Sequence, residues 1–181
     1  MAYLIDHCLR ADYVLEYIDV YSTYEAHYKM NEIKPMQSLK PFKIGTIKIL
    51  PIPVEHGKTE NNAFIFMDKE NSMFFGTDFS LMSFDVSNIK FTKIFIECNY
   101  ADELLQEVLD SENDEFRLKH IRQVSTHMSK ENCKAHLRKM DLSKCEEIVL
   151  LHPSMFLIKK EETKKEFEQE FKIKTYFARE K

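Results

Sequence analysis

The chain has 181 residues, a formal net charge of −4, 44% hydrophobic residues and 31% charged residues. These values are typical of a folded domain in water and exclude an intrinsically disordered chain. Without an excess of basic residues, a general nucleic-acid coat is disfavoured, although a local cleft could still bind a phosphodiester. Only 3 glycines and 5 prolines are present, which leaves little material for linkers. We therefore predict a single domain over residues 1–181.

The cysteines and the apolar runs indicate where the protein resides. Cys8, Cys98, Cys133 and Cys145 lie far apart and form no CxxC pair, so we expect packed thiols in a reducing compartment. The first residues lack the apolar core of a signal peptide, and no later run reaches the roughly 18 apolar residues of a membrane helix. We expect a cytoplasmic protein that does not enter membranes.

Helical and extended patterns alternate along the chain, which predicts a mixed α/β (α+β) fold. The predicted elements are a helix over 8–18, a strand over 18–22, a helix over 23–28, one long strand over 42–54, a hairpin of 63–67 with 73–75, a strand over 93–96, helices over 102–109, 115–124 and 130–140, a strand over 147–151, a charged helix over 159–171 and an edge strand over 173–177. The last two elements form a tail to which we assign a structural role.

Polar residues fall where the apolar, strand-like runs end. His56, Asp78, Glu97 and His152 each follow such a run directly or within two residues. If these strands run in a common direction, their ends bring two imidazoles and a carboxylate to one edge of the sheet. Those groups are preferred ligands of zinc and similar divalent ions. Any one of these residues alone would more often be an ordinary loop residue, so the prediction of a metal site depends on the combination.

The order and the residue patterns of these segments resemble those of the metallo-β-lactamase superfamily, especially its ribonuclease Z-like and small phage or bacterial phosphodiesterase branches. The resemblance spans nearly the whole chain. Asp6 and His7 resemble the end of the family's HxHxDH motif, and VEHG around His56 resembles its strand-end histidine. FFGTDFS around Asp78 resembles the turn whose aspartate bridges two metals, and EIVLLHPS around His152 resembles the last histidine strand.

Two further segments resemble the family between those motifs. IECNYADELL resembles its ESNHD-like segment, and THMSKENCKAHL resembles its GHLS-type loop. The second similarity implies that His127 is the proton donor beside a scissile phosphate. Glu97 would contact a metal-binding histidine or brace its loop. We assign His27, His120 and His136 to solvated positions or to positions next to a metal ligand.

The main departure lies at the amino terminus, where Ala2 and Leu4 occupy the positions of the first two histidines of HxHxDH. The resemblance implies that Asp6, His7, Asp78 and His152 complete one metal position. The second position would keep His56 and share Asp78, and two protein ligands hold a metal poorly. We therefore expect one ion, zinc or manganese, rather than two.

The resemblance implies an αββα metallo-β-lactamase-like sandwich that is amino-terminally shortened and lacks the first strands. Without those strands we expect one edge of the sheet to be exposed, and either a homodimer or the charged tail would cover that edge.

The function implied is that of a metal-dependent hydrolase, a phosphodiesterase or nuclease-like enzyme. It would act on a nucleotide or nucleic acid through a metal-activated water, which Asp6 would orient. The alternative is a catalytically impaired or truncated protein of the same fold that acts as a binding or interaction module. Ala2 and Leu4 favour this alternative.

Overall fold

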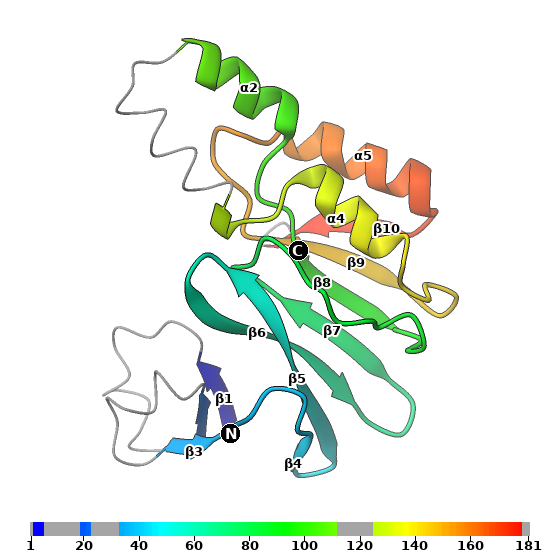
Figure 1. Cartoon of the computed structure of the whole chain (residues 1–181). Helices are drawn as coiled ribbons and strands as arrows, with labels where there is room; N and C mark the ends of the chain where they lie inside the picture. Colours follow the sequence, from blue (N-terminus) through cyan, green and yellow to red (C-terminus); the bar gives the residue numbers. More distant parts are fainter. Residues whose placement is uncertain (1, 6–18, 23–32, 112–124, 179–181) are drawn as a thin grey trace.

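A computed structural model describes residues 2–5, 19–22, 33–111 and 125–178 (Figure 1). The small parallel sheet has the order β1-β2-β3 and the large mixed sheet the order β10-β9-β8-β7-β6-β5-β4. The strands are β1 (Ala2–Ile5), β2 (Asp19–Ser22), β3 (Ile33–Pro35), β4 (Phe42–Ile44), β5 (Ile47–His56), β6 (Thr59–Met67), β7 (Ser72–Gly76), β8 (Lys93–Glu97), β9 (Glu147–Leu151) and β10 (Lys174–Phe177). In the large sheet, β4 to β7 pair antiparallel, and β7 to β10 pair parallel.

The main core lies between the large sheet and the helices α4 (Lys130–Leu137) and α5 (Lys160–Phe171). Helix α2 (Asp102–Ser111) lies on the same side of the sheet (Figure 1), and its Leu105 packs in a separate cluster with Tyr100 and Leu157. Ile65, Phe74, Ile94 and Ile148 are register partners on four successive strands, and all four are fully buried. Phe167 of α5 packs into the same cluster. None of the helices in the described part of the chain combines the length and the apolarity needed to cross a bilayer.

A smaller apolar cluster occupies the other face of the sheet. Met36, which follows β3, packs with Ile49 of β5 and Phe64 of β6. Residues next to each other along a strand point to opposite faces, so this cluster is separated from the main core by the sheet itself. The large sheet therefore packs against helices on one face and against the segment leading out of the small sheet on the other.

Most predicted elements are confirmed, with one correction. The run 42–54 is not one strand, because Gly45 adopts a positive φ of 60° and turns the chain between β4 and β5. Glycine reaches this left-handed region at little steric cost, so it allows a hairpin where the apolar pattern alone predicts continuity. The hairpin β6–β7 and the edge strand β10 lie where they were predicted. The helices predicted over 8–18, 23–28 and 115–124 lie outside the described residues.

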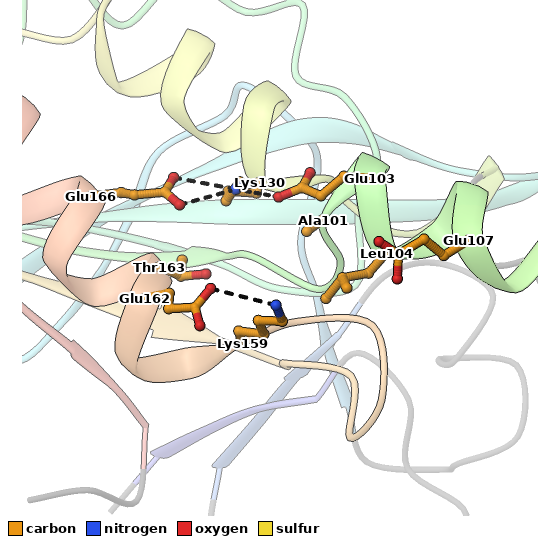
Figure 2. Close-up of a pocket in the computed structure, with 9 residues that line it drawn as sticks. All are labelled: Ala101, Glu103, Leu104, Glu107, Lys130, Lys159, Glu162, Thr163 and Glu166. Carbon is orange, nitrogen blue, oxygen red and sulfur yellow. Dashed lines mark hydrogen bonds and ion pairs between the residues drawn. The ribbon is translucent and has the colours of Figure 1, made fainter.

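Buried lysines connect the three helices, and Figure 2 shows one of them, Lys130, between Glu103 and Glu166. The side chain of Lys130 is 8% exposed, and its Nζ lies 2.7 Å from Glu103 Oε1 of α2 and 3.2 Å from Glu166 Oε2 of α5. One turn later, Lys134 Nζ lies 2.8 Å from the same Glu166 oxygen. Burial lowers the pKa of Lys130, but hydrogen bonds with Glu103 and Glu166 outweigh it and hold that pKa above its ordinary value. Together the two lysines cross-link α2, α4 and α5.

Two phenylalanines give a matched test of this packing. Phe167 is fully buried and Phe156 is 82% exposed. We expect Phe167→Ala to lower the free energy of unfolding by about 3–5 kcal/mol, because the substitution leaves a cavity in the core. Phe156→Ala should change the free energy of unfolding by no more than about 0.5 kcal/mol. Urea denaturation followed by circular dichroism measures both, and equal losses would contradict the described core.

Candidate metal centre

Strand direction brings the polar strand ends to one edge of the large sheet. Strand β5 pairs antiparallel with β6, and β6 pairs antiparallel with β7, so β5 runs in the same direction as β7, β8 and β9. His56 is the last residue of β5, and Glu97 is the last residue of β8. Asp78 follows β7 by two residues, and His152 directly follows β9. The common direction assumed from the sequence is therefore present.

Four side chains form a compact group at this edge. Asp78, Glu97, His127 and His152 each offer one nitrogen or oxygen atom, and these atoms lie within 4.8 Å of one another. His152 Nδ1 lies 3.0 Å from Asp78 Oδ1 and 3.4 Å from Glu97 Oε1. His127 Nδ1 lies 2.8 Å from Glu97 Oε1. Two carboxylates therefore face two imidazoles, a donor set that suits zinc and related divalent ions.

Glu97 is the most enclosed member of the group, with a side chain that is 0% exposed. The backbone N–H of Phe79 donates to its Oε2 at 2.7 Å, while His127 and His152 face its Oε1. Burial raises the pKa of Glu97, but the hydrogen bonds with His127, His152 and Phe79 together outweigh it, so the pKa lies below its ordinary value. Glu97 is therefore a buried carboxylate that requires these donors to stay charged.

His152 is the most accessible member, with 46% of its side chain exposed. The hydrogen bond with Glu97 raises the pKa of His152, burial opposes this rise, and the negative charge of Asp78 adds to it. The His152 ring thus contacts the buried Glu97 carboxylate on one side and solvent on the other. It is the member of the group that an incoming cation or substrate reaches most easily.

Each of the three imidazoles turns its Nδ1 atom toward an oxygen acceptor. Ionised carboxylates and carbonyl oxygens carry no proton, so the Nδ1 atoms of His127 and His152 both donate to Glu97 Oε1. His152 Nδ1 also lies 3.0 Å from Asp78 Oδ1. His56 Nδ1 lies 3.0 Å from the carbonyl oxygen of Thr126 and donates in the same way. In the neutral ring this leaves the proton-free Nε2 as the metal-binding nitrogen. The ring of His127 lies between the other two, with centroid distances of 5.7 Å to His56 and 4.8 Å to His152.

Strained backbone occurs at two members of the group. Asp78 has a φ of 54° and His152 a φ of 52°, in the left-handed region that non-glycine residues rarely adopt. A buried asparagine amide stabilises each position. Asn61 Nδ2 donates to the carbonyl of Asp78, and Asn99 Nδ2 donates to the carbonyl of His152 at 2.6 Å. Such strain persists where the surrounding structure compensates for it, and it concentrates at functional sites.

Solved structures of similar fold were found by comparison. A metallo-β-lactamase fold protein from Bacillus subtilis, YhfI, matches 98% of this chain and 74% of its own length, with a TM-score of 0.69 and 15% identity. A diphosphatase of the PhnP family matches 89% of this chain and 55% of its own length, with a TM-score of 0.55 and 16% identity. Human tRNase Z, short form, matches 98% of this chain and 64% of its own length, with a TM-score of 0.55 and 10% identity. The chain has the metallo-β-lactamase fold.

The α/β sandwich and the fold that the sequence motifs implied are therefore confirmed. At such low identities the likeness establishes the fold and not an activity. The chain spans about half of the PhnP-family diphosphatase and about three quarters of YhfI. No protein-family model matches the chain, and no curated protein matches its sequence significantly.

Within this metallo-β-lactamase fold, the predicted site residues fall into three sets. Asp78 and His152 lie in the compact group. His56 lies beside it, against the ring of His127, and is not a member of the group. Asp6 and His7 lie outside the described residues, so their metal-binding roles, and that of Asp6 in orienting water, stay predictions.

Two members of the group were not in the metal set predicted from sequence. His127 was predicted as a proton donor and Glu97 as a brace for a histidine. The structure places both within 4.8 Å of Asp78 and His152. The signal for Glu97 was its position at the end of an apolar strand, where an ionisable residue disrupts the pattern. The signal for His127 was the loop motif alone, because spacing does not relate it to the strand ends.

The buried carboxylate gives a testable pH effect in chelator-treated protein. Because Glu97 raises the folded-state pKa of His152, His152 stabilises the fold fully below its unfolded pKa of about 6.5, and this contribution is lost as pH rises through the folded pKa. We expect Glu97→Gln to lower the pKa of His152. Nuclear magnetic resonance titration of the imidazole signals measures it, and an unchanged pKa would contradict the contact.

Proposed function

We propose that the chain is a metal-dependent hydrolase that cleaves phosphodiesters. The observation that carries the proposal is the compact group of Asp78, Glu97, His127 and His152, in which His152 Nδ1 is held against a buried carboxylate. Proteins use such contacts to fix the tautomer of metal-binding histidines and to direct Nε2 toward the ion. The carboxylates of Asp78 and Glu97 also concentrate negative charge at this edge of the sheet, which a divalent cation would neutralise.

We assign the metal to Asp78 and His152, together with Asp6 and His7 from the sequence prediction. Glu97 acts as a positioning residue, because Phe79 N–H occupies one of its oxygens and two imidazoles face the other. Zinc or manganese suits these nitrogen and oxygen donors, and one ion is favoured over two because His56 lies outside the compact group. A bound divalent ion would lower the pKa of a water to about 7 and polarise a phosphoryl oxygen.

His127 supplies the proton for the leaving oxygen. Glu97 Oε1 accepts from its Nδ1 at 2.8 Å, so the ring is held with Nε2 directed away from the carboxylate. A general acid must be held within hydrogen-bond reach of the leaving oxygen, and this contact fixes the position of the ring. The side chain of His127 is 19% exposed, so it can meet a substrate while remaining oriented.

A phosphodiester is the substrate class that the loop around His127 favours, since THMS resembles the GHLS-type loop of the phosphodiesterase branches. The names of two proteins of similar fold, a diphosphatase and a tRNase, also support this proposal of a phosphodiester substrate. A nucleotide or nucleic acid is the substrate we propose. Homodimer formation and a cytoplasmic location stay predictions.

Metal content is the first test. Purified protein reconstituted with zinc should bind one equivalent, measured by plasma mass spectrometry after desalting. Asp78→Ala and His152→Ala should lose it, while Asp110→Ala, which removes an exposed carboxylate on α2, should retain it. Glu97→Gln should weaken zinc binding by about 10–100-fold, because the carboxylate orients ligands without occupying the metal. Wild-type protein that binds no divalent metal would contradict the hydrolase proposal.

Hydrolysis of bis-p-nitrophenyl phosphate tests the role of His127. His127→Ala should lower kcat by about 10²–10⁴-fold, the usual contribution of a positioned general acid. Its zinc content should stay at the wild-type level, because the acid is not assigned as a metal ligand. An unchanged rate would remove His127 from the mechanism, and loss of zinc would make it a ligand instead. A zinc-loaded wild type without activity on any diester would favour the binding-module alternative.

A further inference from the structure

Exposed apolar side chains gather on the loops that carry the candidate metal centre. Among the described residues, Met155 is 86% exposed and Phe156 is 82% exposed, the highest values for large hydrophobic side chains. Both lie within four residues of His152. Leu81, 42% exposed, follows Asp78 by three residues. Apolar side chains of this size are costly to leave in water, and where they cluster they usually mark a binding surface.

Hydrogen bonds hold the backbone of the loop that follows His152, and this backbone conformation leaves Met155 and Phe156 exposed. Asn99 holds the loop at two points, since its amide donates to the carbonyl of His152 and its own carbonyl accepts from Ser154 N at 2.8 Å. The Ser154 hydroxyl accepts from the N–H groups of Phe156 and Leu157 at 3.4 and 3.3 Å.

Leu157 anchors the far side of this loop. It is 1% exposed and packs with Tyr100 and Leu105, and its carbonyl accepts from Ala101 N at 2.7 Å. A loop held before and after its tip cannot turn Met155 and Phe156 inward without breaking these contacts. The two side chains are thus presented to solvent beside the metal centre.

We propose that Met155 and Phe156 form a contact surface for an aromatic ring of the substrate, a nucleobase attached to the scissile phosphodiester. This inference rests on the proposed function and names the part of the substrate that lies outside the metal group. Phe156 lies four positions after His152 in the chain, so their Cα atoms are at most about 14 Å apart. A phosphate at His152 therefore leaves the rest of a nucleotide within reach of the ring.

The chemistry of the surface favours an aromatic ring over other occupants. Phenylalanine stacks on any base, and the thioether of methionine makes favourable contacts with aromatic rings. Neither side chain can donate or accept the hydrogen bonds that distinguish one base from another. The surface therefore predicts a preference for base-bearing diesters without a preference for base identity.

Two diesters with the same leaving group test the proposal on the zinc-loaded full chain. Thymidine 5′-(p-nitrophenyl phosphate) carries a base, and methyl p-nitrophenyl phosphate does not. The ratio of their kcat/KM values isolates the contribution of the thymidine. Phe156→Ala should lower this ratio by at least about 5-fold, the smallest effect expected for a lost base stack. Phe156→Trp, which keeps a stacking face, should preserve it.

Ile47→Ala is the matched control, because Ile47 is 42% exposed at the opposite end of β5 from His56. It should leave the ratio unchanged. If both diesters are hydrolysed and the ratio does not fall in Phe156→Ala, the surface does not bind the base and the inference is wrong, while the hydrolase proposal stands.

Binding measurements separate this inference from the proposed activity. Calorimetric titration with thymidine 5′-monophosphate should show at least about 5-fold weaker binding to Phe156→Ala than to the wild type. This result would support the surface even if neither diester were hydrolysed, and equal binding or no binding would overturn it.

Two other occupants have their own readouts. A wild-type dimer that becomes monomeric in Phe156→Ala, measured by sedimentation velocity, would make the surface a self-interface. Phe156-dependent cosedimentation with phosphatidylglycerol–phosphatidylcholine vesicles would make it a lipid contact. Either outcome would overturn the assignment to a base.

Discussion

The burial of the Glu97 carboxylate is the constraint on which the rest of the site depends. A carboxylate without solvent must be surrounded by donors, since leaving it unpaired costs several kcal/mol. Here the donors come from three separate loops: the N–H of Phe79 after β7, the ring of His127 before α4, and the ring of His152 after β9. Solvating one buried charge therefore fixes the relative positions of all three loops.

The helices behind the site reinforce this arrangement. Each loop that leaves the site after Glu97, His127 or His152 leads into one of the helices α2, α4 and α5. Lys130 joins the first turns of α2 and α4 to α5 through Glu103 and Glu166 (Figure 2). The buried Glu97 carboxylate thus holds the three loops of the site together, and the buried Lys130 holds together the helices that follow them. Exposed ion pairs contribute little to stability, whereas removing a buried partner is costly.

The sequence predicted the strands and the edge at which their ends meet, because apolar runs in a layered α/β protein have few other places to lie. It did not predict where a run divides, since the turn at Gly45 depends on one backbone angle. Nor did it place His136 correctly. This residue lies in a charged helical segment and was assigned to a solvated position or to one beside a metal ligand. It is 6% exposed, and Met82 N lies 3.5 Å from its Nε2.

The spacing of apolar residues in the sequence does not distinguish the core residue His136 from the site residue His127. Burial lowers the pKa of His136 and the positive charge of Lys139 adds to this effect, so the ring stays neutral inside the core. His127, nine positions earlier, meets a carboxylate instead. What separates a core histidine from one of the site is the group across from it on another element, and only the tertiary structure supplies that partner.

The polar residues that break the strand pattern carry the most information about the site. Asparagine is disfavoured in strands, yet Asn61 lies within β6, and its amide stabilises the left-handed backbone of Asp78. Asn99 does the same for His152 from just beyond β8. Asn61 thus occupies a strand position that asparagine disfavours in order to hold a strained neighbour of the site, whereas Asn99 acts from the loop after β8. Exceptions to local rules that are compensated by long-range contacts are expected at functional positions, and here both compensating contacts converge on the same edge of the sheet.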